Sequence, residues 1–316
     1  MKGILSRARR WLSRAEVGHI NILSHVGGWR YVASACLPAY VLRQFYRNDV
    51  GCAFGVDRKA KAELVKRFQM AYRGIPTATS WLYHVVLATD ILKVPQQIQG
   101  SVIECGCWKG GSTASLSLVC SLVGRKLIVC DSFEGLPEDE RDVVHQYPHV
   151  GVFGYYQKGM YAGRLEEVKG NIGRYGDLSV CQFVPGFFSE SLKTLTEPIV
   201  FGFLDVDLAR SMRDCVKHIW PVLVDGGLIY TDDSCDMEVV RIWFDDDWWQ
   251  RELGCRAPGY VGSGCGLPLS PNFSSLGYAR KVLDPTRSYN RVSWLCYHDS
   301  NVSRPENNGE SMEIQT

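Results

Sequence analysis

The stretch SVIECGCWKGGST, residues 101–113, decides the fold, because a strand pattern changes there into a helix pattern through a glycine-rich turn. The short apolar run before Gly106 predicts a buried strand. Gly110 and Gly111 open a run to Gly124 that predicts a helix, and a helix N-terminus favours anionic groups. Glu104 precedes Gly106 by two positions, where an acidic residue could hold the amino-acid portion of a zwitterionic cofactor, directly or through the loop. The stretch therefore predicts a nucleotide-binding strand–turn–helix unit.

The residues after this unit alternate short β-branched runs with helical stretches, which predicts a doubly wound parallel α/β sheet. We expect seven strands, the last pair forming an antiparallel hairpin from residues 274–283 and 291–298. The stretch 133–176 is too long for a simple connection, and we expect it to form a lid. The other strands are expected at residues 101–106, 126–132, 178–186, 198–207 and 226–233, and a single helix is expected over residues 237–253.

Three regions are expected along the chain. Residues 1–99 are mainly helical in pattern and would form an N-terminal cap over the sheet. Residues 100–300 would form the catalytic domain, and residues 301–316 a polar tail. No internal repeat is evident.

The composition excludes a strong electrostatic attraction to nucleic acid. The 316 residues carry 35 Lys and Arg against 34 Asp and Glu, a net charge of +1, so we expect no nucleic-acid partner. The N-terminus lacks the pattern of a signal peptide, and the 12 cysteines show no paired CxxC spacing typical of a zinc site. We therefore expect a cytoplasmic protein with reduced thiols. We also expect a homo-oligomer.

The N-terminal residues 1–14 are basic, and their apolar side chains fall on one helical face. We favour a helix that docks on the catalytic domain or on a partner subunit. The alternative is peripheral contact with the inner face of a membrane. The apolar run at residues 31–42 is too short to span a bilayer.

The glycine-rich turn does not complete the dinucleotide fingerprint. That fingerprint would need glycines at positions 106, 108 and 111, and position 108 is Trp. A nucleotide-dependent oxidoreductase is therefore disfavoured but stays as an alternative. Asp131 ends the second strand, where a carboxylate accepts hydrogen bonds from ribose hydroxyls. A tight structural turn with a helix cap is the alternative without a ligand.

Four carboxylates follow two strands that are otherwise apolar. Asp205 and Asp207 interrupt FLDVDLARS, residues 203–211, and Asp232 and Asp233 end IYTDDS, residues 229–234. Carboxylates this close repel one another and lose hydration on burial, so a cation would stabilise them. Side chains two apart on a strand share a face, whereas adjacent ones diverge unless the chain leaves the strand. Helix caps or solvated loop ends are the alternative.

Five motifs, in order, resemble the macrocin O-methyltransferase family: VIECGCWKGGST, CDSFEGLP, VPGFFSESL, FLDVDL and LIYTDD, which together cover about residues 100–235. The resemblance implies a class I methyltransferase fold and transfer of a methyl group from S-adenosylmethionine to a sugar hydroxyl of a carbohydrate or glycosylated natural product. It implies Mg²⁺ held by Asp205, Asp232 and Asp233, with Asp207 as general base. It also implies contacts to the cofactor by Glu104, Gly106, Trp108, Gly110, Ser112, Asp131, Ser132, Phe133, Gly186, Phe187 and Asp205.

Residue chemistry agrees with that implication. Hard oxygen ligands suit Mg²⁺, and a cation lowers the pKa of a sugar hydroxyl and stabilises the developing alkoxide. The chain departs from the family after the second aspartate, where Ala209 and Arg210 replace Tyr and Glu, and at Ser234, where an aromatic residue is usual. A catalytically silent or membrane-associated nucleotide-binding subunit is therefore the remaining alternative.

Overall fold

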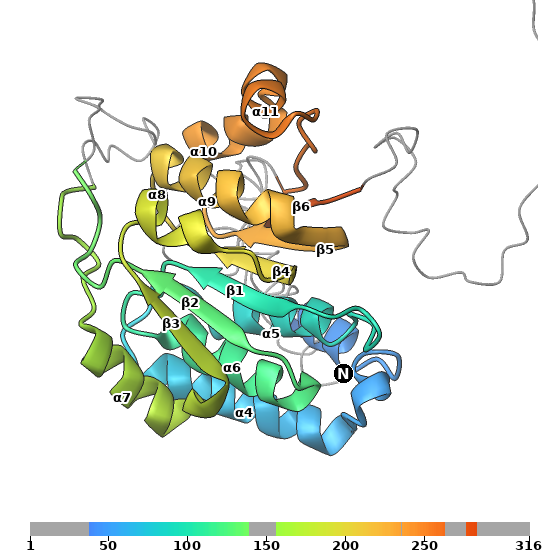
Figure 1. Cartoon of the computed structure of the whole chain (residues 1–316). Helices are drawn as coiled ribbons and strands as arrows, with labels where there is room; N and C mark the ends of the chain where they lie inside the picture. Colours follow the sequence, from blue (N-terminus) through green and yellow to red (C-terminus); the bar gives the residue numbers. More distant parts are fainter. Residues whose placement is uncertain (1–37, 139–155, 235, 263–275, 283–316) are drawn as a thin grey trace, which may run out of the picture. The chain divides into compact units, whose positions relative to one another are not determined.

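The structure is a computed structural model that describes residues 38–138, 156–234, 236–262 and 276–282 (Figure 1). The chain's contacts divide it into two units, residues 1–281 and 282–316. The fold described below is that of the first unit, and Val282 alone represents the second among the described residues.

The first unit is built on a six-stranded mixed sheet with the order β3-β2-β1-β4-β5-β6. Neighbours from β3 to β5 pair in parallel, and β6 runs antiparallel to β5. The predicted α/β class is therefore confirmed for the described residues, and the sheet ends in an antiparallel pair, β5 with β6. The predicted hairpin between residues 274–283 and 291–298 stays a prediction. The strands are β1 (Ser101–Cys105), β2 (Leu127–Asp131), β3 (Cys181–Pro185), β4 (Ile199–Leu204), β5 (Leu223–Thr231) and β6 (Gly277–Arg280).

The register aligns the carboxyl ends of the central strands. Cys105 at the end of β1 pairs with Cys130 of β2 and with Leu204 of β4, and Leu204 in turn pairs with Thr231 of β5. The residues that follow these positions therefore leave the sheet side by side. In open α/β sheets this edge is where ligands bind.

Helices cover both faces of the sheet, which makes three layers (Figure 1). One face carries α4 (Arg58–Gly74), α5 (Trp81–Ile91), α6 (Gly111–Val123) and α7 (Leu165–Tyr175). The other carries α8 (Phe188–Ser191), α9 (Ala209–Val222), α10 (Met237–Arg241) and α11 (Asp246–Leu253). Alternate strand residues enter the two cores: Val102 and Val129 face α6, whereas Ile103 and Ile128 face α9. Both faces are buried, so these strands read as continuous apolar runs.

The N-terminal helices begin where side chains cap them. Asp57 accepts a hydrogen bond from the Ala60 amide at 2.7 Å to start α4, and Ser80 accepts from the Leu82 amide to start α5. Helices α4 and α5 pack against α6, and Phe68 and Leu87 share one core with the sheet. The boundaries predicted at residues 99 and 300 stay predictions. No described helix is both long and apolar enough for a bilayer crossing.

Two expectations differ from the structure. Part of the stretch 133–176, expected as a lid, is α7, which packs on α6 and completes the β2–β3 crossover. The single helix expected over residues 237–253 is broken into α10, a 3-10 turn and α11, because Asp245 caps a new helix by accepting from the Trp248 amide. Residues 139–155 of the expected lid, the strand at 291–298, the N-terminal residues 1–14 and the tail 301–316 lie outside the described residues.

Candidate functional site

The loop after β1 is shaped by two left-handed glycines. Gly106 has φ +82° and Gly110 has φ +83°, values that glycine adopts without steric cost. A Cβ atom on Gly106 would overlap the carbonyl oxygen of Asp205. The loop predicted to bind the cofactor is therefore in direct contact with the start of the acidic motif. Trp108 also has a positive φ, 44°, so the loop is strained at a bulky residue.

Asp131 ties this loop to the end of β2. Its Oδ2 accepts hydrogen bonds from the amides of Cys107 at 2.7 Å and Trp108 at 3.2 Å, and its Oδ1 accepts from Phe133 at 2.8 Å. The carboxylate thus fixes the position of both loops. The predicted contact between Asp131 and ribose hydroxyls stays a prediction.

Glu104 is a fully buried acid in β1. Its side chain is fully buried, and neither carboxylate oxygen has a hydrogen-bond partner among the described residues. Burial raises its pKa to about 7, while the nearby Ser112 and Thr113 hydroxyls lower it. A buried carboxylate without partners is costly unless a ligand contacts it. In charge, its unpaired carboxylate fits the positively charged amino group of a zwitterionic cofactor.

The other predicted cofactor residues lie on neighbouring loops of the same edge. Ser112 is buried in the first turn of α6. The Ser132 hydroxyl donates to the Gly135 carbonyl at 2.8 Å, and Phe133 has φ 59°. The Gly186 amide donates to the Asp131 carbonyl at 2.9 Å, and the Phe187 side chain, next in the chain, is 40% exposed.

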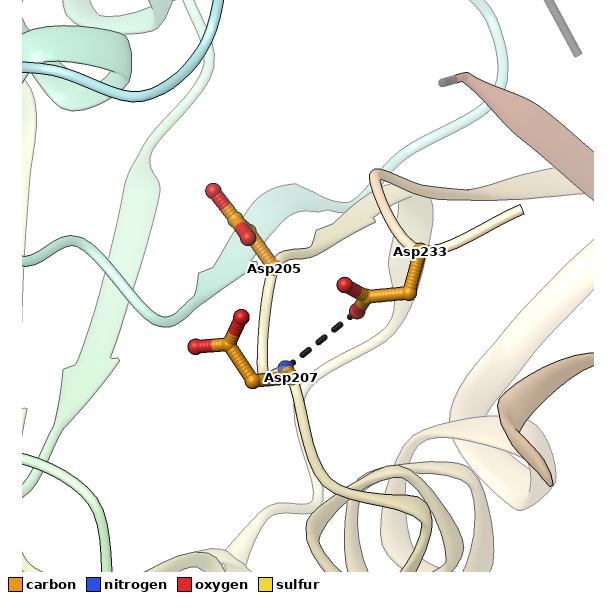
Figure 2. Close-up of side chains that lie close together, drawn as sticks. All are labelled: Asp205, Asp207 and Asp233. Carbon is orange, nitrogen blue, oxygen red and sulfur yellow. Dashed lines mark hydrogen bonds between the residues drawn. The ribbon is translucent and has the colours of Figure 1, made fainter. Parts of the chain in front are cut away.

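The acidic motifs meet at the ends of β4 and β5. One carboxylate oxygen from each of Asp205, Asp207 and Asp233 lies within 4.8 Å of the others (Figure 2). All three side chains are half-buried. Three converging carboxylates are a donor set that suits a hard divalent cation. The residues present therefore fit Mg²⁺.

A strained turn, and not a strand, brings Asp207 into this group. β4 ends at Leu204, and a three-residue turn is closed by the Leu208 amide, which donates to the Val206 carbonyl at 2.5 Å. Asp207 lies at its centre with φ 58°, and its own amide donates to Asp233 Oδ2 at 3.2 Å. Asp205 and Asp207 do share one site, as expected. The expected cause, alternation along a strand, is wrong, because both residues follow the end of β4.

Burial and repulsion between carboxylates raise the pKa values of these aspartates. Burial raises the pKa of Asp205 well above its usual value, and the charges of Asp232 and Asp207 raise it further. Burial and the charges of Asp207 and Asp205 do the same for the pKa of Asp233. Burial raises the pKa of Asp207 to about 6. A bound cation would offset these costs.

Asp232 lies beside the three-carboxylate group and is not one of its members. It is buried, its amide donates to the Leu204 carbonyl at 3.1 Å, and its charge acts on Asp205. The predicted role of Asp232 as a metal ligand stays a prediction. The chain leaves β5 at Thr231, as a shared site for adjacent aspartates requires.

Three residues near the site were missed by sequence reasoning. Interaction with the Tyr156 side chain lowers the pKa of Asp207, against the larger effect of burial. The Tyr161 ring packs edge-on against Trp108 at 5.4 Å between centroids, and Gly163 touches the Trp108 carbonyl so closely that a Cβ would overlap it. Tyr156 and Tyr161 belong to an aromatic run inside the polar stretch 133–176. That run was the sequence feature from which these residues could have been proposed.

Helix α7 braces the same loop from outside. Lys109 forms an ion pair with Glu167 at 2.9 Å, and the Asn171 side-chain amide donates to the Lys109 carbonyl at 2.9 Å. The loop after β1 is therefore held by Asp131 on one side and by α7 on the other.

The amino-acid sequence is similar to those of known O-methyltransferases. The chain is 33% identical over 141 residues to 8-demethyl-8-(2,3-dimethoxy-alpha-L-rhamnosyl)-tetracenomycin-C 4'-O-methyltransferase of Streptomyces olivaceus, covering 43% of this chain and 53% of that protein. It is 26% identical over 145 residues to demethyldecarbamoylnovobiocin O-methyltransferase of Streptomyces niveus, covering 44% and 55%. The chain thus matches about half the length of these curated relatives.

Among solved structures, the O-methyltransferase NovP aligns with a TM-score of 0.49 at 19% identity, over 78% of this chain and 99% of that one. Residues 82–254, which run from α5 to the end of α11, match the family described as macrocin O-methyltransferase. That span includes the loop after β1, Asp131 and all the aspartates at the ends of β4 and β5. The chain therefore belongs to the macrocin O-methyltransferase family.

Proposed function

We propose that the protein is an S-adenosylmethionine- and Mg²⁺-dependent O-methyltransferase that acts on a sugar hydroxyl of a carbohydrate or glycosylated natural product. The observation that carries the proposal is the convergence of Asp205, Asp207 and Asp233 next to the loop after β1. Family membership supports it. The two curated relatives support the acceptor class, because one is named for a rhamnosyl-tetracenomycin and the other for demethyldecarbamoylnovobiocin.

The cofactor would lie across the carboxyl ends of β1, β2 and β3. Glu104 would receive the amino group, because its buried oxygens have no partner among the described residues. The loop from Gly106 to Gly110 would let the ligand approach the backbone closely. When bound, S-adenosylmethionine supplies an activated methyl group, and Mg²⁺ supplies a charge that stabilises a developing alkoxide.

Asp205 and Asp233 would hold the cation, and Asp207 would accept the proton of the acceptor hydroxyl. The contact between Gly106 and the Asp205 carbonyl sets the cofactor loop against the acidic group. This contact would hold the proposed cofactor loop and the proposed cation site at a fixed separation, as in-line transfer requires. Asp232, beside Asp205, would add charge to the cation site.

The test joins binding to product analysis. Calorimetry with S-adenosylmethionine is expected to show binding of the cofactor that survives removal of Mg²⁺. Mass spectrometry of rhamnosylated aglycones incubated with enzyme, cofactor and Mg²⁺ is expected to show a gain of one methyl group, lost in EDTA. Absence of cofactor binding would overturn the proposal, and methyl transfer that is indifferent to EDTA would overturn its metal component.

The predicted homo-oligomer and the membrane contact of residues 1–14 stay predictions. Nothing in the described residues favours an oxidoreductase or a silent subunit over methyl transfer.

A further inference from the structure

Two aromatic residues with left-handed backbone contact each other beside the loop after β1. Trp108 in that loop has φ 44°, and Tyr161, on the segment that leads into α7, has φ 57°. Their rings meet edge to face, with centroids 5.4 Å apart and an interplanar angle of 81°. Glycine adopts such backbone without steric cost, as Gly106 and Gly110 do in the same loop. Strained aromatic residues at both positions therefore indicate that their side chains have a role.

The segment that carries Tyr161 also lies against the backbone of the loop. A Cβ on Gly163 would lie 1.9 Å from the Trp108 carbonyl oxygen and 3.2 Å from the Lys109 amide nitrogen. The φ of Gly163 is outside the left-handed region, so the close approach, and not a turn, requires glycine there. Residues 161–163, which we call the strap, thus contact Trp108 through both its ring and its carbonyl group.

The strap is anchored on both sides. Directly before it, the Met160 carbonyl accepts a hydrogen bond from the Leu136 amide at 2.8 Å, which ties it to the segment after β2. Directly after it, the Arg164 carbonyl accepts from the Val168 amide at 3.0 Å, which starts α7, and α7 packs on α6. A segment held at both ends can hold the loop after β1 in place, because it does not move freely with the loop.

The strap and Asp131 act on the same residue of the loop. The Trp108 amide donates to Asp131 Oδ2 at 3.2 Å, whereas the strap contacts the Trp108 ring and carbonyl. The amide, the carbonyl and the side chain of Trp108 are thus all in contact with neighbouring segments. A loop that already has its bound shape loses less conformational freedom when a ligand binds, which increases affinity.

We propose that Tyr161 is a positioning residue for the cofactor, and that the strap holds the loop after β1 in the shape that binds S-adenosylmethionine. This inference rests on the proposed function, because it takes this loop as the cofactor site. Tyr161 acts through Trp108, so its loss changes cofactor affinity and not the chemistry at the carboxylates. The affinities for S-adenosylmethionine and for S-adenosylhomocysteine, which lacks the transferred methyl group, should fall together, because the strap controls the shape of the loop.

The first experiment measures cofactor affinity by calorimetry on the full-length protein. Tyr161→Leu removes the ring contact, and we expect the Kd for S-adenosylmethionine to rise roughly 3- to 10-fold. Tyr161→Phe keeps the ring and should stay within about twofold of wild type. Tyr46→Leu is the matched control, because Tyr46 is also half-buried and its ring meets Phe45 edge to face at 5.7 Å. The control should bind like wild type. An unchanged Kd in Tyr161→Leu, or an equal loss in Tyr161→Phe, would overturn the role of the ring contact.

The second experiment moves the strap by a different route. Gly163→Ala places a methyl group against the Trp108 carbonyl, and Gly170→Ala in α7 is the control, because a Cβ on Gly170 meets nothing within 4 Å. We expect the Kd for S-adenosylmethionine to rise roughly tenfold or more in Gly163→Ala and to stay at the wild-type value in Gly170→Ala. In an assay with saturating cofactor, Mg²⁺ and a rhamnosylated acceptor, kcat and acceptor KM of Gly163→Ala should stay within about twofold of wild type.

The outcomes separate this inference from the proposed function. If wild type does not bind S-adenosylmethionine, the proposed function fails. If wild type binds and neither Tyr161→Leu nor Gly163→Ala changes the Kd, only the inference fails. A fall in affinity for S-adenosylmethionine without a fall for S-adenosylhomocysteine would also overturn the inference, because the strap would then act on the methyl group or its charge. Tm of each variant without cofactor confirms that the proteins compared are folded at the temperature of the titration.

Discussion

Backbone strain marks the candidate site residue by residue. Among the described residues, the non-glycine residues with positive φ are Trp108, Phe133, Tyr161 and Asp207. Each lies in the loop after β1, in the loop after β2, in the segment that packs on Trp108, or in the acidic turn. Left-handed backbone costs roughly 1–2 kcal/mol per residue outside glycine, and such strain gathers at functional sites. The strained residues here lie in or beside the proposed cofactor loop and the proposed cation site.

The two adjacent aspartates after β5 give the sharpest residue-scale prediction. Asp233 belongs to the three-carboxylate group and Asp232 does not, so Asp233→Asn should weaken divalent cation binding more than Asp232→Asn does. We expect a loss of about 100-fold or more in Mn²⁺ affinity for Asp233→Asn and about tenfold or less for Asp232→Asn, by analogy with losses at ligands and their supports. Calorimetry with Mn²⁺ measures both. Equal losses would make both residues ligands, as the family resemblance implied.

Gly106 gives a second prediction at this scale. Its φ is +82°, and a Cβ would overlap the Asp205 carbonyl, so Gly106→Ala combines strain with a clash against backbone. We expect it to lower the free energy of unfolding by roughly 3 kcal/mol or more. Gly124→Ala is the matched control, because Gly124 has φ +64° with nothing within 4 Å. The control should cost only about 1 kcal/mol. Urea unfolding of the two variants checks the difference, and equal costs would contradict the predicted clash.

At the scale of elements, the sequence predicted the central sheet because buried parallel strands are read directly from apolar runs. It did not predict α7, because Leu165–Tyr175 carries two glycines and polar residues on its outer face. The break between α10 and α11 was missed because the capping role of Asp245 depends on local geometry. For the site, the sequence named all four aspartates, Asp205, Asp207, Asp232 and Asp233. Which of their side chains converge depends on the turn at Asp207, which spacing does not encode.

Helix α5 carries a pH-dependent element of stability. His84 is fully buried, its Nε2 lies 3.1 Å from the Thr79 hydroxyl, and burial lowers its pKa to about 3. The unfolded chain therefore binds one proton more than the folded protein between pH 6.5 and about 3, so stability falls as pH falls through that window. The loss is ~1.4 kcal/mol per pH unit.

The test compares the wild type with His84→Gln, which cannot titrate. Between pH 6.5 and 5 the free energy of unfolding of the wild type should fall by ~2 kcal/mol relative to the variant. Urea unfolding at both pH values measures the difference, in which the buried carboxylates common to both proteins cancel. His218→Gln, at a half-buried position of α9, is the matched control and should leave most of the slope in place. Parallel pH profiles for wild type and His84→Gln would refute the assignment.

For the whole molecule, the acidic group predicts a linkage between divalent cations, protons and folding. Burial and mutual repulsion raise the pKa values of Asp205 and Asp233 well above normal, and burial raises that of Asp207 to about 6. The folded protein without metal then binds more protons than the unfolded chain as pH falls through these values. These carboxylates therefore destabilise the metal-free fold at high pH, and their repulsion is relieved as the pH is lowered.

Mg²⁺ should relieve the same repulsion at high pH and compete with protons at low pH. A cation that binds only the folded state at 100 times its Kd stabilises by ~2.7 kcal/mol, a shift of several degrees in Tm for a chain of this size. We expect Mg²⁺ to raise Tm at pH 8, EDTA to abolish the rise, and the rise to shrink at pH 5.5. Asp205→Asn, which removes one carboxylate of the group, should raise the metal-free Tm at pH 8 relative to wild type and remove most of the response to Mg²⁺. A response to Mg²⁺ that is equal at both pH values, or that persists in Asp205→Asn, would place the cation somewhere other than the ends of β4 and β5.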